Sequence, residues 1–547
     1  MHLSHGAAMV RAMARTTLSG DPTIPSSESP SGPRARWTSL WPPALAGALA
    51  AGVAIAVAEL FAGLVQGAPS LVIAIGSLVI SIQPPGAKDV FVNLFGSNDK
   101  LALNVLIVVV ALVIAASAGI RAARRFRDGA LVFAAFGLVG LFAAVRQPLV
   151  SQPLAMVNAI LAVLVGLATL RWLLSLAPLP KVAAATLPYT PEWTRRRFLI
   201  SSAGTLGVAV IGGGLGRVLL EQQHAQGVVS TSRLPAALQA VAPLAADQSL
   251  DVAGITSLVV PTDRFYRIDT ALLVPQVDVT TWELEIKGMV DNPLTFTYDE
   301  LLGMPLIERY VTIACVSNRV GDRLVGNALW TGVRLKDVLE MAGVQPGATQ
   351  IVGRSVDDFT AGFPTSWAMA PGREPMIAVG MNREPLPADH GFPARLIIPG
   401  LYGYVSATKW LSSIELTTRE AVDGYWVPLG WAKDAPILTQ SRIDVPGSGA
   451  SLAAGPVQVA GVAWAPDRGI SKVEVRVDDG DWQAARISQP ISNATWVQWA
   501  LPWTATTGRH RLEVRATDGT GDIQTDQVSE PAPDGARGHH RIFVNVG

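Results

Sequence analysis

The sequence predicts a multi-span α-helical membrane anchor followed by an α+β domain and a C-terminal β-sandwich. Three observations lead to this fold class. Apolar stretches long enough for transmembrane helices fill most of residues 41–216. From about residue 251, strand-like and helix-like patterns occur together, which is typical of a mixed globular domain. From about residue 450, short alternating strands run into Asp-Gly turns, which is typical of an all-β domain.

The composition supports this division and excludes several classes of protein. Of the 547 residues, 49% are hydrophobic and only 16% are charged, a balance that indicates membrane segments. The chain carries 43 basic and 43 acidic side chains, without the clustered Lys and Arg that a nucleic-acid-binding face needs. The single cysteine excludes an intramolecular disulfide framework, and no Cys/His spacing resembles a zinc site.

In the N-terminal third of the chain, the sequence predicts a disordered segment that is followed by membrane-spanning segments. Residues 1–40 are rich in Ser, Pro, Gly and Arg, which predicts a disordered cytoplasmic segment. Residues 41–176 are predicted to form a four-span membrane domain. Glu59 lies inside the first span; it is either a functional carboxylate or, as we favour, one that reaches a headgroup or a neighbouring helix. The apolar stretches are 43–66, 101–120, 129–145, 147–170 and 198–216.

The distribution of basic residues predicts the orientation of these spans. Arg34 and Arg36 precede the first span, "RAARRFR" (121–127) follows the second, and "RRR" (195–197) precedes the fifth. The positive-inside rule places all three clusters in the cytoplasm. Residues 68–87 have an apolar core of only about ten residues, and the number of crossings requires this segment to stay at the interface. Everything after residue 220 is then expected outside the cytoplasm.

The entry to the fifth span suggests a particular export route. It reads "TRRRFLISSAG" (194–204), and residues 194–220 resemble a twin-arginine signal that remains as an anchor helix. That route serves proteins that fold around a cofactor before export. The alternative is a basic flank that only stops transfer. Residues 221–250, which contain Ala and Gln, are predicted to be a linker.

Residues 251–425 show the patterns of an α+β domain. "WELEIKGMV" (282–290) alternates like a strand, and "LKDVLEMAG" (335–343) has helical apolar spacing that ends at a glycine. Residues 426–547 are predicted to form a small immunoglobulin-like sandwich. Its strands include "VEVRVDDGDW" (473–482), "HRLEVRATDGTG" (510–521) and "RIFVNV" (541–546).

Cys315 is the first residue that could carry chemistry. It follows a predicted buried strand, Tyr310 to Ala314, and precedes a loop with Arg319 and Arg323. Nearby arginines favour a thiolate, the form that binds a soft metal. The spacing alone leaves two interpretations open, an inert buried thiol and a functional one, and it favours the inert thiol.

A second candidate cluster is "PADHGFPARLIIPGLYGYVSATKWL" (387–411), which combines His390, Arg395 and Lys409 with a loop rich in Gly and Pro. This set suits an anionic group such as a phosphate, through charge-assisted hydrogen bonds and backbone N–H groups. A solvated loop between buried strands is the alternative. A third stretch, "DRFYRID", places Arg267 beside aromatic residues.

Together these segments resemble the molybdopterin-binding domain of the sulfite oxidase family. The match is carried by the cysteine followed by Ser-Asn-Arg, by "MNREPLPADHGFPARLIIPG" (381–400) and by "TKWL" (408–411). "GVAWAPDRGISKVEVRVDDGDW" (461–482) resembles the C-terminal immunoglobulin-like domain of that family, which is often a dimerisation module. The resemblance covers nearly all of the chain after residue 250.

The resemblance implies a molybdenum–pyranopterin cofactor and a set of residues that hold it. Cys315 matches the thiolate that ligates the metal, and Arg267 matches an arginine that faces the substrate pocket, so both are candidate catalytic residues. Arg468 matches a further basic residue near the pocket. The family's aspartate is assigned to Asp357, with the adjacent Asp358 as the alternative. The candidate cofactor-binding residues are Phe265, Tyr266, Arg267, Asp269, Asn318, Asp357, His390, Arg395, Thr408 and Lys409.

Three departures from the family pattern bear on the substrate. Val320 stands where the sulfite-oxidising members have a second arginine, Asp269 replaces a histidine, and Trp431 is nearest to the position of an active-site tyrosine. Losing a cation and gaining a carboxylate is expected to weaken the binding of doubly charged sulfite. Sulfite is therefore kept as a candidate substrate but is not favoured.

The resemblance implies a two-electron oxygen-atom transfer on a small substrate. The apolar spans and the charge pattern place this reaction outside the cytoplasm, in a multi-pass protein of the cell membrane. A reductase of S-oxides or N-oxides in the same family is the first alternative, and a membrane receptor with outer binding domains is the second. No haem is expected, because the predicted spans contain no histidine, so electrons must pass to or from a separate partner. A homodimer is a candidate assembly, and no nucleic-acid partner is expected.

Overall fold

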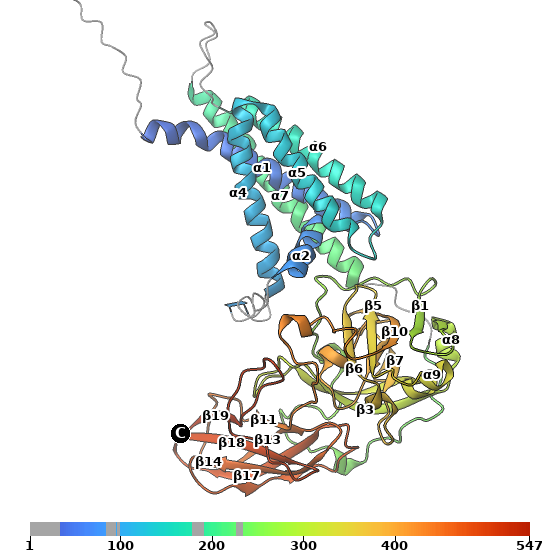
Figure 1. The fold of residues 1–547 in the computed structure, drawn as a ribbon. Coiled ribbons are helices and arrows are strands. Elements are labelled where there is room, and N and C mark those ends of the chain that lie inside the picture. Colours follow the sequence, from blue (N-terminus) through green and yellow to red (C-terminus); the bar gives the residue numbers. More distant parts are fainter. Residues whose placement is uncertain (1–32, 84–93, 96–98, 178–190, 226–232) are drawn as a thin grey trace, which may run out of the picture.

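The computed structural model describes residues 33–83, 94–95, 99–177, 191–225 and 233–547 (Figure 1). A bundle of helices comes first along the chain, followed by an α+β domain and a C-terminal β-sandwich. Most of the N-terminal segment that the sequence predicts to be disordered lies outside the described residues.

Among the described residues, the helical bundle contains five helices that are long and apolar enough to cross a membrane. They coincide with the five apolar stretches of the sequence. The shorter helix α2 (Leu71–Ile82) has 12 residues, whereas a crossing needs about 20. The five long helices are α1 (Pro33–Leu64), α4 (Asp99–Arg124), α5 (Phe126–Val145), α6 (Gln152–Leu176) and α7 (Pro191–Ala225).

Helix α1 lies at the centre of the bundle, against α4, α6 and α7. Glycines allow these close crossings. A Cβ added at Gly216 of α7 would lie 2.4 Å from the backbone nitrogen of Leu60, and one added at Gly47 would lie 2.0 Å from the backbone oxygen of Ala115. Small residues let helix backbones approach in this way inside membranes. Helix α7 is thus an integral part of the bundle.

Glu59 binds the start of helix α2. Its Oε1 accepts a hydrogen bond of 2.6 Å from the Oγ of Ser70, and Ser70 is the N-cap of α2, with its Oγ accepting from the N–H of Ile73 at 3.2 Å. The Nδ2 of Asn158 donates to the backbone oxygen of Pro69 nearby, at 2.9 Å. A carboxylate beside a helix N-terminus is a stabilising arrangement. Glu59 therefore reaches a neighbouring helix, as the favoured explanation expected.

Two sheets form the α+β domain. One has the strand order β2-β1-β10-β5-β6, and the other has the order β3-β4-β7-β8, with β9 paired to β7. The strands are β1 (Glu283–Gly288), β2 (Leu294–Thr297), β3 (Leu306–Ala314), β4 (Val325–Arg334), β5 (Gln350–Ser355), β6 (Thr360–Pro364), β7 (Met376–Met381), β8 (Glu384–Pro385), β9 (Arg395–Ile397) and β10 (Leu411–Thr417).

Short helices connect these strands, and the predicted elements are present. The strand expected within 282–290 is β1, and the helix expected at 335–343 is α9 (Leu335–Ala342). Gly343 ends α9 in the left-handed conformation, with φ of 68°. The other helices of the domain are α8 (Tyr298–Gly303), α10 (Thr365–Met369) and α11 (Gly403–Ser406).

The C-terminal region is a sandwich of two sheets, β11-β13-β17-β16 and β12-β19-β18-β14-β15. Buried side chains of both sheets, such as Trp499 and Val514, share one core. The sandwich begins at Gln440, later than the predicted boundary at residue 426. Its strands are β11 (Gln440–Val445), β12 (Ser451–Leu452), β13 (Gly455–Trp464), β14 (Ile470–Val477), β15 (Gln483–Ala484), β16 (Arg486–Ile487), β17 (Val497–Ala505), β18 (Gly508–Asp518) and β19 (His540–Val546).

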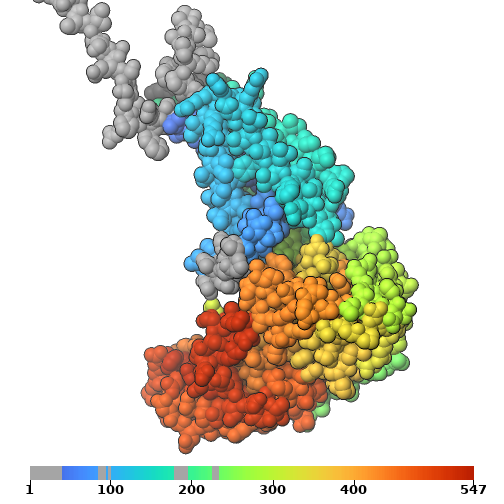
Figure 2. All heavy atoms as spheres, viewed as in Figure 1, coloured from blue at the N-terminus to red at the C-terminus, as the bar shows by residue number. Residues whose placement is uncertain are grey.

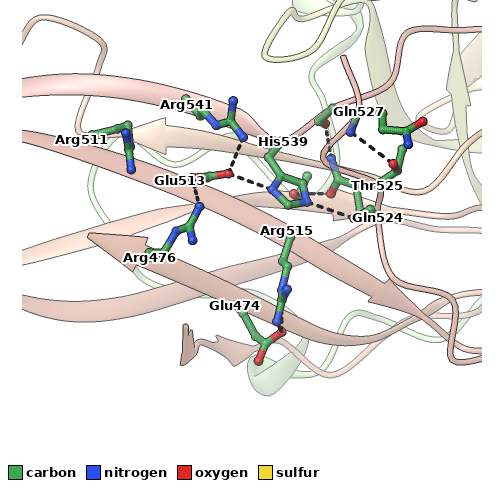
Figure 3. Close-up of polar contacts among 12 residues, drawn as sticks. Glu474, Arg476, Arg511, Glu513, Arg515, Gln524, Thr525, Gln527, His539 and Arg541 are labelled. Carbon is green, nitrogen blue, oxygen red and sulfur yellow. Dashed lines mark hydrogen bonds and ion pairs between the residues drawn. The ribbon is translucent and has the colours of Figure 1, made fainter. Parts of the chain in front are cut away.

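An ion-pair network covers the outer face of the second sheet (Figure 3). Glu513 of β18 alternates with core residues such as Leu512, so its side chain points away from the core. It accepts hydrogen bonds or ion pairs from Arg476 at 2.7 Å, His539 at 2.8 Å and Arg541 at 2.9 Å. Its side chain is nevertheless only 1% exposed. A carboxylate buried in this way depends on its cationic partners.

The α+β domain and the sandwich share a core. Trp496 of the sandwich is fully buried in the core of the α+β domain, and Trp464 belongs to the same cluster. The indole Nε1 of Trp496 donates to the backbone oxygen of Leu258 at 2.7 Å, and its backbone N–H donates to the Oγ1 of Thr312 at 2.8 Å. The two domains are therefore held together by buried contacts.

Residues 233–250, which the sequence predicts as a linker, run along both domains. Gln239 forms a parallel bridge with Ile307 of β3. Leu250 packs with Ala460 of the sandwich. Residues 233–250, which we call the strap, are therefore bound to the folded domains. The backbone at Gln239 pairs with a strand edge, and Leu250 packs into an apolar site.

The bundle lies on one side of the α+β domain (Figure 2). Leu272 and Leu273 of that domain pack with Ala62 of α1, Ile73 of α2 and Leu220 of α7. These contacts bring the ends of three helices to the same side of the domain as the pocket described next.

Candidate active site

Cys315 directly follows β3, in a tight loop that leads to β4. Its backbone N–H donates to the oxygen of Leu324 at 2.9 Å. The side-chain oxygen of Asn318 accepts from the N–H of Leu324 at 2.7 Å. Asn318 thereby closes the loop that presents Cys315. The half-buried sulfur lies 2.9 Å from the Oγ of Ser317.

Aromatic side chains form one side of the candidate site, the set of residues around Cys315, His390 and Lys409 that we call the pocket. Phe265 is buried, stacks on Tyr266 with 5.2 Å between ring centroids, and meets Trp330 and His390 edge-on at 5.9 and 5.8 Å. Gly326 makes this position available, because a Cβ there would lie 2.7 Å from Cε2 of Phe265. The predicted segment around Phe265 is thus placed against the predicted cluster around His390.

Tyr266 connects this wall to Cys315. Burial raises the pKa of Tyr266 well above its ordinary value, the nearby Cys315 raises it further, and Arg395 lowers it. Burial also raises the pKa of Tyr402 to about 12, again with a contribution from Cys315. Both phenols therefore stay protonated at neutral pH. The hydroxyl of Tyr402 accepts a hydrogen bond of 3.4 Å from the N–H of Leu438.

His390 and Arg395 are buried together. Arg395 lies on β9, and its Nη1 donates to the backbone oxygen of His390 at 3.0 Å. The Nε2 of His390 lies 3.1 Å from the backbone oxygen of Thr262. Burial lowers the pKa of His390 to about 4 and that of Arg395 to about 10. At neutral pH the imidazole is neutral and the guanidinium is charged.

Asp269 joins three cations at the pocket. Its Oδ2 lies 3.2 Å from Lys409 Nζ and 3.2 Å from Arg267 Nε, and its Oδ1 lies 2.9 Å from Lys100 Nζ. Burial opposes ionisation of Asp269, but the charges of these cations hold its pKa well below its ordinary value. Burial also lowers the pKa of Lys409 to about 8, although Asp269 acts against this shift.

This arrangement corrects the charge argument about sulfite. The sequence suggested that Asp269 adds negative charge to the substrate pocket. In the structure its side chain is only 6% exposed and is bound by Lys409, Arg267 and Lys100, so this group carries a net positive charge.

The other predicted site residues lie nearby or in supporting positions. Asp357 is within electrostatic reach of Asp269, and burial raises its pKa. Asp358 is instead exposed and 3.9 Å from Arg354. Thr408 is buried, with its Oγ1 donating to the backbone oxygen of Gly353 at 3.3 Å.

Two arginines considered in the sequence point elsewhere. Arg468 binds Asp518 at 2.8 Å and Thr439 at 3.1 Å, within the C-terminal part of the chain. Arg319 lies 3.3 Å from Glu530 of that part, in an ion pair whose members are both more than half exposed.

Sequence reasoning missed Tyr402 and Lys100. Tyr402 lies within the quoted 387–411 cluster, and only its burial beside Cys315 distinguishes it. Lys100 precedes an apolar span at its predicted outer end, and a basic residue there runs against the positive-inside pattern. This unusual position was the signal in the sequence that could have identified Lys100.

The pocket is chemically suited to a pterin that carries a metal. The Nδ1 of His390 and the Nε of Arg395 are both buried without a partner. A neutral imidazole and a guanidinium there offer one acceptor and one donor, which fits a heteroaromatic ring with N–H and ring-nitrogen atoms. In the described part of the chain no three His, Cys, Asp or Glu side chains converge.

Comparisons with known proteins point to the same cofactor. Residues 271–426 match the family model described as "Oxidoreductase molybdopterin binding domain". Human mitochondrial sulfite oxidase is 29% identical over 305 residues, which cover 47% of this chain and 56% of that protein. Nitrate reductase (NADH) 1 of Oryza sativa subsp. japonica is 37% identical over 179 residues, which cover 28% of this chain and 19% of that protein.

Among solved structures, the sulfane dehydrogenase SoxCD from Paracoccus pantotrophus is similar, with 22% identity and a TM-score of 0.48, over 53% of this chain and 82% of that one. The chain spans about half the length of the human sulfite oxidase. The matched range contains Cys315, His390, Arg395 and Lys409. Residues 271–426 are therefore an oxidoreductase molybdopterin-binding domain, and the chain is similar to sulfite oxidases and nitrate reductases.

Proposed function

We propose that this protein is a membrane-anchored oxidoreductase that transfers an oxygen atom, with two electrons, to or from a small substrate outside the cytoplasm. The observation that carries the proposal is the buried, unpartnered pair of nitrogen atoms on His390 and Arg395. Tyr266 links that pair to Cys315. A buried polar atom without a hydrogen-bond partner is costly, so two of them on the adjoining side chains of His390 and Arg395 support a bound cofactor.

The residues of the pocket have distinct roles in this proposal. Cys315 would ligate the metal through its sulfur, and His390, Arg395 and Lys409 would hold the pterin and its phosphate. When bound, the molybdenum–pterin group supplies the two-electron redox chemistry of oxygen-atom transfer. Phe265 and Tyr266 form an apolar wall that keeps water from one side of the pocket.

Arg267 would orient the substrate. Its side chain is 42% exposed, and its Nε is held by Asp269, so the rest of the guanidinium can meet an incoming polar group. The net positive charge around Asp269 favours a substrate with a negatively charged or strongly polar oxygen. With Val320 in place of a second arginine, a singly charged or neutral oxo compound fits this proposal better than doubly charged sulfite.

The same proposal includes the membrane topology. The start of α4 and the end of α7 both contact the α+β domain, through Lys100 and His224. The basic clusters 121–127 and 195–197 lie at the opposite ends of these helices. If those clusters face the cytoplasm, the catalytic domain lies outside it. Export of a domain already loaded with cofactor would then use the twin-arginine segment at the start of α7.

Two interactions with other chains belong to the proposal as well. A separate electron-transfer partner would complete the reaction, since the redox change at the pocket must be reversed in each cycle. The C-terminal sandwich would act as an immunoglobulin-like module that joins two copies of the chain. Both suggestions rest on the family resemblance.

Metal and pterin analysis of the purified full-length chain is the direct test. We expect about one molybdenum and one pterin per chain, the ratio that a single thiolate ligand implies. The loaded protein should then be screened against sulfite, S-oxides and N-oxides with artificial electron donors and acceptors. A preparation that never contains either component, even when produced with molybdenum and a pterin supply, would exclude the enzyme.

A further inference from the structure

A short segment, Asp269 to Gln276, separates the cofactor pocket from the membrane helices. At its start, Asp269 faces the pocket and contacts Lys409. Lys100, in the first turn of α4, contacts the same carboxylate at 2.9 Å and the backbone oxygen of Ala271 at 2.6 Å. The ammonium group of Lys100, which belongs to the helical bundle, thus makes two contacts with this segment.

The rest of the segment is also docked on the bundle. A Cβ added at Gly76 of α2 would lie 2.7 Å from Cδ1 of Leu272, so the missing side chain makes room for this leucine. The Nδ1 of His224 at the end of α7 lies 2.7 Å from the backbone oxygen of Val274. The Nε2 of Gln276 donates to the backbone oxygen of Gln223 at 2.5 Å.

The charges at Asp269 explain why Lys100 matters to the pocket. Lys409 is 10% exposed and Asp269 is 6% exposed, so the attraction between them is only weakly screened. An anionic cofactor group must compete with Asp269 for the ammonium of Lys409. Lys100 shares the negative charge of Asp269, which weakens that competition and leaves more of the positive charge of Lys409 for the anion.

We propose that Lys100 is a positioning residue of the cofactor pocket: by binding Asp269 it frees Lys409 for an anionic group of the cofactor, and it couples retention of the cofactor to the docking of the membrane bundle. This inference rests on the proposed function. It makes the bundle part of the binding site and not only an anchor, and it assigns Lys100 no contact with substrate or metal.

The first test compares charge variants of the full-length protein in detergent. Lys100→Met removes the ammonium but keeps an unbranched chain, Lys100→Arg keeps the charge, and Lys287→Met is the matched control because Lys287 forms an exposed pair with Glu285. We expect Lys100→Met to release molybdenum and pterin about three- to tenfold faster, as for one partly exposed charge-assisted contact. Lys100→Arg should retain the wild-type rate within about twofold.

If Lys100→Met released molybdenum and pterin at the same rate as Lys287→Met, the inference would be overturned. The result would leave the proposed function intact, because the wild-type protein would still contain its cofactor. Wild-type protein without molybdenum and pterin would instead reject the proposed function itself.

A second measurement needs no variant and applies even if Lys100→Met does not fold. Coupling between two sites is reciprocal, so a cofactor that is retained by the docked bundle must also stabilise the docking. Hydrogen exchange of wild-type protein with and without cofactor should therefore show slower exchange at 269–276 and in the first turn of α4 when the cofactor is present. Slower exchange confined to the α+β domain beyond residue 276 would contradict the coupling.

Discussion

Arg395 donates from Nη1 to the backbone oxygen of His390 at 3.0 Å, while Arg395 Nε and His390 Nδ1 are both buried without a hydrogen-bond partner. The guanidinium carbon of Arg395 lies 5.0 Å from the ring centroid of Trp330. The first contact fixes the two side chains relative to each other. The unpartnered atoms carry a desolvation cost of about 1–3 kcal/mol each until a ligand binds them. The pair is therefore organised for a ligand at the expense of stability.

Replacing Arg395 with methionine should separate stability from cofactor binding. Because the cost of burying Arg395 is not fully offset in the cofactor-free protein, we expect Arg395→Met to keep or raise the thermal midpoint of that form. The same variant should lose at least about nine-tenths of its bound molybdenum and pterin, since a charge-assisted contact is removed. Thermal unfolding and metal analysis measure the two effects.

Arg442 provides the control for Arg395→Met. It is buried like Arg395, but it binds Asp444 at 2.6 Å and the backbone oxygen of Asp322 at 2.9 Å. Breaking such a pair leaves an uncompensated charge and costs about 3–5 kcal/mol, so Arg442→Met should lower the thermal midpoint clearly. An equal loss of stability in both cofactor-free variants would contradict the special status of Arg395.

Replacing Cys315 with serine should abolish turnover and leave the fold unchanged. Serine is close in shape to cysteine but lacks the soft sulfur that binds molybdenum. Turnover is measured with artificial electron donors and acceptors, the fold by circular dichroism, and bound metal by molybdenum analysis. Ser317→Ala, which removes only the 2.9 Å contact to the sulfur, should keep bound metal. Full activity of Cys315→Ser would return the thiol to the inert class.

Glu513 should make the stability of the chain depend on acidic pH. Burial opposes its ionisation, but hydrogen bonds from Arg476, Arg541 and His539 outweigh burial and lower its pKa to about 2 (Figure 3). Because this pKa is below the ordinary value, the stabilisation is fully present above about pH 4.5 and is lost as the pH falls toward 2.

The Glu513→Gln variant tests this dependence. At pH 7 the variant should unfold at a lower temperature than the wild type, because about 2 kcal/mol of charge-assisted bonding is lost. The difference should shrink as the pH falls from 5 toward 2. Glu285→Gln, at an exposed pair, is the control and should change little at any pH. A difference between Glu513→Gln and wild type that does not change with pH would contradict the lowered pKa.

The double variant Arg195→Lys and Arg196→Lys distinguishes the two interpretations of the start of α7. Lysine keeps the positive charge, so a charge-based stop-transfer signal should still work. A twin-arginine signal should fail, leaving the catalytic domain inside the cell. Protease digestion of intact spheroplasts measures the location. Arg124→Lys with Arg125→Lys, in the other basic cluster, is the control and should export normally; unchanged export of both double variants would support the stop-transfer interpretation.

Much of the architecture could be predicted from local sequence patterns. Apolar length located the helices that become α1, α4, α5, α6 and α7, because a helix satisfies its own backbone hydrogen bonds and its length is set by its composition. The glycine stop of α9 and the position of Cys315 after β3 followed from patterns within about ten residues.

The packing between distant segments was not predictable in this way. The strap 233–250 reads as a linker because it contains Ala and Gln without a clear strand or helix pattern, yet it is held by a strand edge and an apolar site that other parts of the chain create. Trp496 likewise lies in the pattern of the sandwich but is buried in the core of the neighbouring domain. Periodicity indicates which face of a strand is buried, but not what covers it.

For the candidate site, the sequence by itself determined the residue types: a cysteine at a strand end, and His390, Arg395 and Lys409 around a loop rich in Gly and Pro. Only the tertiary structure decided their charges and partners. Asp269 reads as an added negative charge in the sequence, whereas Lys100, 169 residues earlier, helps to neutralise it. Electrostatic energies depend on distance and burial, and the fold alone sets both.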